Sequence, residues 1–135
     1  MSSPAEVLNL DKLAAKKGQA VVRELVDKKK VKPGDVDNTV TKALGVLQED
    51  GVYACFLYLM AKEKKKGVIV VEKMLDLLEH LGFGWGRPDE KEPDAVLSFI
   101  TDKVTTKLET MLLAKDTLEK MLIYARYGAK ARAKE

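Results

Sequence analysis

The sequence predicts an all-α protein, a single-domain bundle of about five to six helices with a long C-terminal helix. The clearest sign lies in the last third of the chain, which from Asp102 onward has no proline and one late glycine, Gly128. Apolar residues recur there at the three-and-four spacing of one helix face: Val104, Leu108, Met111, Leu118, Leu122, Ala125 and Ala129. The length of 135 residues suffices for one core, so residues 1–135 are expected to form one domain, with residues 1–10 flexible.

The first helix is predicted from about Asp11 to Lys30. Its apolar side consists of Ala14, Gly18, Val21, Val22 and Leu25. Gly18 either weakens this helix or allows another helix to approach closely. A lysine run then ends the helix, and Pro33-Gly34 forms a turn.

Two further helices are predicted before residue 61. One follows Asp35 and ends near Gln48, with Val40, Ala43, Leu44 and Leu47 facing inward. After a break at residues 49–51, the segment 52–60 is apolar nearly all round, a pattern typical of a helix at the centre of a bundle.

The stretch 68–71 has four β-branched residues, which favour a strand. Helical spacing continues through Val71, Met74, Leu75, Leu78 and Leu81, so a fourth helix with a β-branched start is predicted. Residues 82–93 are predicted to form the longest loop of the chain, and a short fifth helix covers residues 94–101.

The charge is high but nearly balanced, with 24 basic and 21 acidic residues and a net charge of +3. Basic residues exceed acidic ones in residues 11–32 and 103–135, which leaves the middle of the chain acidic. The single cysteine permits no disulfide within one chain and fits the reducing cytoplasm. No apolar run has the length of a membrane span and the amino end does not resemble a secretory signal. The low Asn and Gln content, with many Lys and Glu, is typical of thermophilic proteins.

The sequence offers no pattern that favours catalysis. Cys55 lies in the most apolar segment, His80 lies on a different predicted helix, and no third group to orient them is evident. No cluster of metal ligands at zinc spacing is present, so neither a metal nor a cofactor is expected. The glycines of residues 82–86 follow a predicted helix rather than a strand and lack the spacing of a phosphate-binding loop.

Basic residues are the candidates for binding. On the first helix, Lys12, Lys16, Arg23 and Lys30 fall within about 40° of one another, opposite the apolar side. This stripe suits a row of phosphates, although a solvated helix face has the same composition. A second cluster ends the last helix and comprises Arg126, Lys130, Arg132 and Lys134. The lysines of residues 62–66 form a third basic spot, equally consistent with solvation.

Two segments resemble a known family. Residues 43–62, ALGVLQEDGVYACFLYLMAK, and residues 113–130, LAKDTLEKMLIYARYGAK, are similar to helices of the small subunit of the type III-B CRISPR effector complex, the Cmr complex. The resemblance implies a small, non-catalytic helical subunit whose copies stack along the complex, beside other subunits, and whose basic residues contact the backbone of guide RNA and target RNA. Arg126 is the best-matched position for such a contact, and Lys130 follows it on the same helix.

Two other readings stay open. Residues 39–62 resemble a helix-turn-helix of a DNA-binding regulator, although residues 52–60 offer few polar side chains for base edges. A bundle that serves as a protein-interaction scaffold, without any nucleic-acid role, is the third hypothesis.

Overall fold

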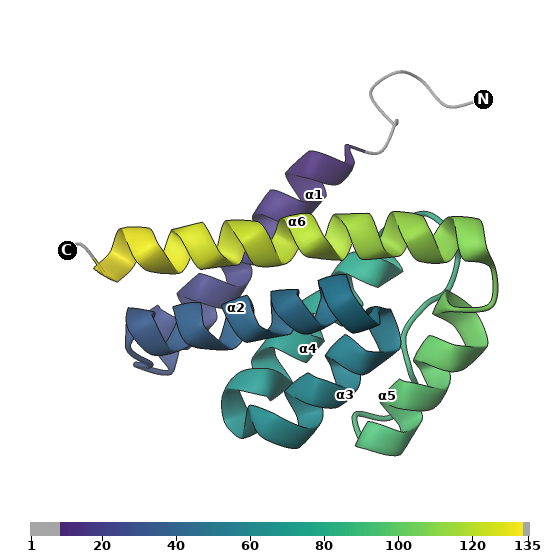
Figure 1. Ribbon diagram of the computed structural model, residues 1–135, viewed down its shortest axis with the longest axis horizontal. Helices are drawn as coiled ribbons and strands as arrows, with labels where there is room; N and C mark the ends of the chain where they lie inside the picture. The colour runs from purple at the N-terminus through teal and green to yellow at the C-terminus, as the bar shows by residue number, and fades with distance from the viewer. Residues whose placement is uncertain (1–8, 134–135) are drawn as a thin grey trace.

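The computed structural model describes residues 9–133, which form six α-helices and two π-helical segments in one compact domain (Figure 1). This confirms the predicted all-α bundle with a long C-terminal helix. In chain order the elements are α1 (Leu10–Val22), η2 (Arg23–Lys28), α2 (Pro33–Asp50), α3 (Val52–Lys62), α4 (Lys64–Glu79), α5 (Pro93–Phe99), η3 (Ile100–Val104) and α6 (Leu108–Ala133). The proposed flexible segment 1–10 falls mostly on residues 1–8, outside the described part, whereas Asn9 caps α1 and Leu10 begins it.

Helix α1 begins where the Asn9 side chain accepts a hydrogen bond from the backbone N–H of Lys12 at 3.0 Å. All five residues of its predicted apolar side are buried. Gly18 does admit a close neighbour, because a β-carbon built on it would lie 2.8 Å from the carbonyl oxygen of Met121 in α6. The helix widens at Arg23 into η2, so the predicted continuous α-helix to Lys30 stops at Val22.

Helices α2 and α3 are joined by Gly51, whose φ of 98° lets the chain turn sharply. Helix α2 starts at Pro33, as a proline in the first turn allows, and buries Val40, Ala43, Leu44 and Leu47 as predicted. Helix α3 does not lie wholly inside the bundle, contrary to the prediction. One side is buried, but Tyr53 and Leu57 are 39% and 44% exposed.

Helix α4 includes the β-branched stretch, which confirms the helical reading. Val70 and Val71 are buried against the other helices, so tertiary packing outweighs their strand preference. Residues 81–92 then form the predicted loop. Gly82, Gly84 and Gly86 have φ of 89°, 73° and 71°, values at which glycine replaces other residues without strain. The repeated glycines of this loop thus serve backbone geometry.

The last helix begins at Leu108 instead of Asp102. Residues 105–107 form a bend between η3 and α6, where Thr106 Oγ1 donates to the Asp102 carbonyl at 2.8 Å and Thr105 Oγ1 to the Thr101 carbonyl at 3.3 Å. Threonine hydroxyls that bond the backbone compete with regular helical pairing. As a result Val104 is buried outside α6, whereas Leu108, predicted to face inward, is 66% exposed.

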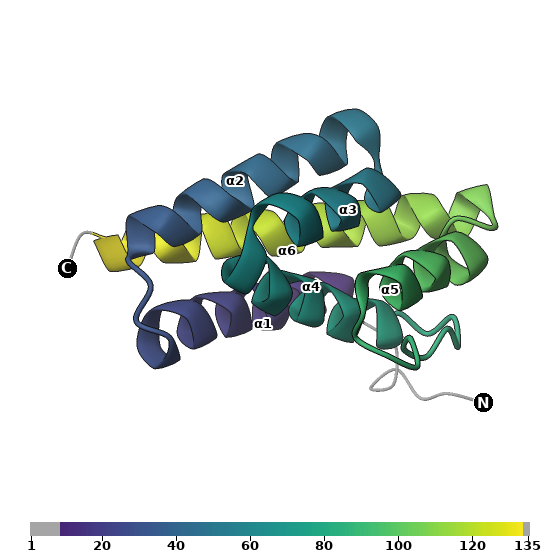
Figure 2. The same ribbon diagram turned by 90° about the horizontal axis from the view of Figure 1, so that it is seen from below.

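Helix α6 lies between α2 on one side and α1 with α4 on the other (Figure 2). It runs antiparallel to α2, since Lys130 meets Asp37 and Lys115 meets Gln48. It runs parallel to α1, since Tyr124 meets Asp11 and Arg132 meets Asp27. Within residues 9–133, no helix has the length and apolar character to cross a membrane.

Candidate nucleic-acid interface

The first lysine run begins at the last residue of η2 and consists of Lys28, Lys29, Lys30 and Lys32. The π-helical segment ends with two backbone hydrogen bonds that span more residues than an α-helical bond does. Lys29 N–H donates to the Glu24 carbonyl at 2.9 Å, and Val31 N–H donates to the Leu25 carbonyl at 2.8 Å. Lys30 takes a left-handed conformation with φ of 60°. This turns Val31 toward the core and leaves all four lysines exposed.

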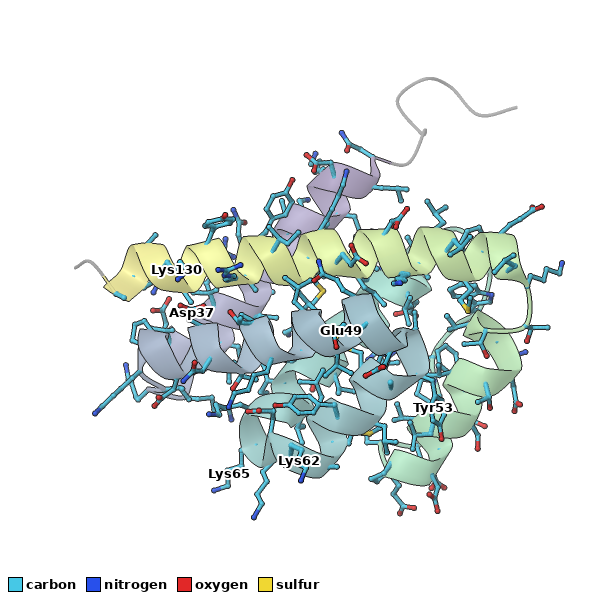
Figure 3. All side chains as sticks on the ribbon, in the orientation of Figure 1. Asp37, Glu49, Tyr53, Lys62, Lys65 and Lys130 are labelled. Atoms are coloured by element: carbon cyan, nitrogen blue, oxygen red, sulfur yellow. The ribbon has the colours of Figure 1, made fainter. Side chains whose placement is uncertain are left out.

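The second lysine run surrounds the junction of α3 and α4 and consists of Lys62, Lys64, Lys65 and Lys66. Figure 3 shows Lys62 and Lys65 pointing away from the body of the protein. Within this run Glu63 points inward, where Thr39 Oγ1 and Tyr58 Oη each donate a hydrogen bond of 2.7 Å to its carboxylate. Burial opposes ionisation of Glu63, yet these two bonds and the nearby lysines hold its pKa below the ordinary value.

The two runs lie across one hollow of about 530 Å³, here called the lysine hollow. Basic and apolar residues line it together, with Lys29 coming from the first run and Lys65 and Lys66 from the second. The apolar lining comprises Leu25, Val31, Val68 and Ile69. Residues 29 and 65 are far apart in the sequence, so the fold alone brings these cations together.

The lysines of the two runs are largely free of internal neutralisation. Lys66 lies 4.0 Å from the Glu63 carboxylate, and in the described part of the chain no other member of either run has a carboxylate within salt-bridge distance. Like charges that line one hollow repel one another, and a polyanion would relieve that repulsion. The arrangement therefore suits a phosphate backbone.

The predicted stripe on the first helix is placed partly as expected. Lys12, Lys16 and Arg23 are all exposed on the outward side of α1 and η2. Arg23 also donates to the Gln19 side chain at 3.3 Å. Lys30 lies beyond the helix, in the left-handed turn, and so belongs to the first lysine run rather than to a continuous stripe.

The basic end of α6 is largely occupied by internal ion pairs. Lys130 Nζ lies 3.0 Å from Asp37 Oδ2 (Figure 3), and Arg132 donates to both carboxylate oxygens of Asp27. Burial raises the pKa of Asp37, but Lys130 and Thr41 hydrogen bonds and the Arg126 charge outweigh this and lower it overall. Lys134 lies outside the described residues.

Arg126 is the half-buried member of this group. Its guanidinium carbon lies 5.9 Å from the centre of the exposed Tyr127 ring, and its buried Nε has no hydrogen-bond partner in the structure. An aromatic ring next to an arginine is a pairing that RNA-binding surfaces use for base stacking. The structure does not bring Arg126 or Lys130 into the lining of the lysine hollow.

Cys55 and His80, the two residues considered for catalysis, lie in different surroundings. Cys55 is fully buried, its thiol donates to the Ala43 carbonyl at 3.4 Å, and burial raises its pKa to about 12. His80 is exposed at the end of α4, where Nδ1 lies 2.7 Å from the Asp76 carbonyl oxygen. Among residues 9–133, no three His, Cys, Asp or Glu side chains are grouped so as to hold a metal ion.

Searches for similar proteins found no matching family model, no matching curated protein and no matching solved structure. The two lysine runs were each visible in the sequence as separate basic spots. What sequence reasoning missed was their juxtaposition. No periodicity within either segment could indicate it, because it depends on how the η2–α2 connector packs beside the start of α4.

Proposed function

We propose that this chain is a non-catalytic small subunit of a cytoplasmic, type III CRISPR RNA-guided antiviral effector complex, and that its lysine hollow contacts the RNA backbone. The single observation that carries the proposal is that lysines of both runs line one hollow, with few carboxylates to neutralise them. Recognition through backbone charge is independent of base sequence, as a guide-based system requires.

The resemblance stated from the sequence supplies the rest of the proposal. Both similar segments are helical, since residues 43–62 form the end of α2 with α3 and residues 113–130 lie within α6. The proposed partners are guide RNA, target RNA, further copies of this chain and the other subunits of the complex. In this role Lys12, Lys16, Arg23 and Arg126 add phosphate contacts, and Lys130 adds one when its ion pair with Asp37 opens.

The DNA-binding regulator is the second candidate, and the position of α3 counts against it. The helix that would enter the major groove buries Val52, Cys55, Phe56 and Leu59 in the core. Its outward side presents Tyr53 and Leu57, of which only the Tyr53 hydroxyl could form a hydrogen bond with a base edge. The scaffold without a nucleic-acid role predicts that charge reversal on the surface leaves every interaction intact.

A binding measurement tests the proposal directly. Labelled single-stranded RNA of mixed sequence is titrated with the purified protein and with Lys29→Glu/Lys65→Glu, and fluorescence anisotropy is recorded. We expect the double variant to bind at least about tenfold more weakly and to lower the log–log salt slope by about 1.4, since each phosphate contact contributes about 0.7. Lys103→Glu/Lys107→Glu makes the same charge change at exposed residues near the start of α6 and should have a much smaller effect.

The stripe is tested by Lys12→Glu/Lys16→Glu/Arg23→Glu in the same titration. Equal affinity for all variants would overturn the RNA contact and favour the scaffold, and a strong preference for duplex DNA would favour the regulator. Membership of the complex is tested by tagging the chain in its native host. Co-purification of several other proteins with short RNAs would support it, whereas a protein that purifies alone would contradict it.

A further inference from the structure

A second hollow, of about 290 Å³, shares Val68 with the lysine hollow but has a different character. We refer to it as the apolar pocket. Its walls come from three helices: Met60 of α3, Val71 and Leu75 of α4, and Val96 of α5. Val71, Leu75 and Val96 are themselves buried core residues. The walls are therefore held in place by the packing of the bundle.

One edge of the apolar pocket is formed by residues 87–91 of the loop that joins α4 to α5. Arg87 fastens this edge to α4, because its guanidinium pairs with the carboxylates of Asp76 and Glu79. Further up the loop, the rings of Phe83 and Trp85 pack with their centres 4.8 Å apart, and both lie against the core. The pocket is thus preformed, and a ligand need not order the loop to bind.

The rim of the apolar pocket carries an excess of negative charge. Glu72, Asp89 and Glu90 line it together with Lys91, and Lys73 Nζ lies 3.8 Å from Glu72, so Asp89 and Glu90 are the carboxylates without a salt bridge in the described residues. Arg87 also lines it, but Asp76 and Glu79 already neutralise that charge. Complementary charge favours an occupant with basic groups at its edges.

The size and surroundings of the pocket favour a protein side chain over a free small molecule. Its volume falls just below the range of roughly 300–1,000 Å³ typical of small-molecule sites. Part of the apolar lining is open to solvent, since Val68 is 58% exposed, and Leu57, one turn before the lining residue Met60, is 44% exposed. Such extended apolar surface around a preformed pocket is characteristic of an interaction surface with a buried anchor.

We propose that the apolar pocket docks a segment of a partner protein, which inserts a bulky apolar side chain and places lysine or arginine against Asp89 and Glu90. The apolar pocket would bind a different kind of ligand from the lysine hollow. This proposal therefore does not depend on whether the lysine hollow binds RNA. Two surfaces of opposite charge on one small bundle would allow the chain to hold a basic protein segment and a polyanion at the same time.

The test uses two labelled peptides with the same leucine anchors, one flanked by lysines and the other by glutamates. Titration followed by anisotropy should show saturable binding of the lysine peptide alone. Asp89→Lys/Glu90→Lys should weaken that binding by about tenfold. Glu49→Lys/Asp50→Lys, which adds the same charge at the exposed end of α2, should leave it nearly unchanged.

The apolar part of the site has its own matched pair. Val68→Asn changes a side chain that is 58% exposed, and Leu108→Asn one that is 66% exposed, so both variants should fold. Only Val68→Asn should weaken the lysine peptide. Equal binding of both peptides, equal loss in the control variants, or no binding tighter than about 1 mM would overturn the proposal. Concentration-dependent dimers that Val68→Asn abolishes would also overturn it, by assigning the pocket to a second copy of this chain.

Discussion

Gly67 packs directly against the backbone of Leu59, so that a β-carbon built on Gly67 would lie 2.2 Å from the Leu59 carbonyl oxygen. This contact fixes the first turn of α4 against the last turn of α3, and the four lysines of the second run belong to these two turns. Gly67 has the ordinary helical backbone, so what it provides is close approach rather than an unusual conformation. The position of the second lysine run therefore depends on the absence of a side chain at residue 67.

Gly67→Ala should destabilise the protein, because the new methyl group meets backbone that cannot rotate away. Overpacking of this kind costs about 1–3 kcal/mol of the free energy of unfolding. Gly45→Ala is the matched control, since a β-carbon on Gly45 in α2 has no heavy atom within 4 Å. It should instead stabilise the protein by about 0.5–1 kcal/mol through helix propensity. Urea titration of both variants checks the opposite signs, and a neutral Gly67→Ala would contradict the packing described.

Glu63→Gln should lower stability near neutral pH by about 1–3 kcal/mol, because the buried carboxylate accepts charge-assisted hydrogen bonds from Thr39 and Tyr58. The pKa of Glu63 is lowered in the folded protein from its ordinary value of 4.5. The carboxylate thus stabilises the fold fully above pH 4.5, and this contribution is lost as pH falls through the lower, folded-state pKa.

The measurement is chemical denaturation of both proteins at a series of pH values from neutral to well below 4.5. The difference in the free energy of unfolding between wild type and Glu63→Gln should stay constant at first and then decrease in acid. Glu49→Gln, at an exposed carboxylate, should change stability by less than about 0.5 kcal/mol at every pH. A difference that widened in acid would show that the sign of the pKa shift is wrong.

Asp37→Asn should strengthen RNA binding if Lys130 takes part in the interface. The substitution removes the carboxylate 3.0 Å from Lys130 Nζ and leaves the ammonium group available to phosphate. We expect about threefold tighter binding at low salt, together with a stability loss of no more than about 1 kcal/mol.

Asp35→Asn makes the same change in net charge at an exposed residue of the first turn of α2. An equal gain in RNA affinity in both variants would mean that the change in net charge alone strengthens binding and that Lys130 makes no contact with RNA.

Cys55 should resist alkylation in the folded protein. It is fully buried, and burial raises its pKa to about 12, so the reactive thiolate is scarce at mildly alkaline pH. Reaction with iodoacetamide should therefore proceed only as fast as the protein opens, and it should be rapid in denaturant. The destabilised Gly67→Ala variant should react faster than wild type. Rapid reaction of the native wild-type protein would contradict the burial of this thiol.

The sequence by itself determined the class of the fold, because helical periodicity is a local property. The apolar side of the first helix and the inward residues of the second were read correctly from spacing alone. For Gly18 the sequence left two alternatives, a weakened helix or a close neighbour, and the structure shows the close neighbour to be Met121. The helical state of residues 68–71 was also predicted, because the longer apolar pattern outweighed the local strand preference.

Tertiary structure decided the places where local pattern is silent or misleading. The final helix begins at Leu108 because residues 105–107 form a threonine-rich bend before it. Lys30 lies outside the predicted stripe because it follows the π-helical segment in a left-handed turn. The predicted basic residues Lys130 and Arg132 became partners of Asp37 and Asp27, which no helical wheel of α6 alone contains. The two lysine runs met across a hollow because distant segments packed together. Spacing along a chain fixes which side chains share one helix face, whereas the meeting of faces from different helices depends on how the whole core packs.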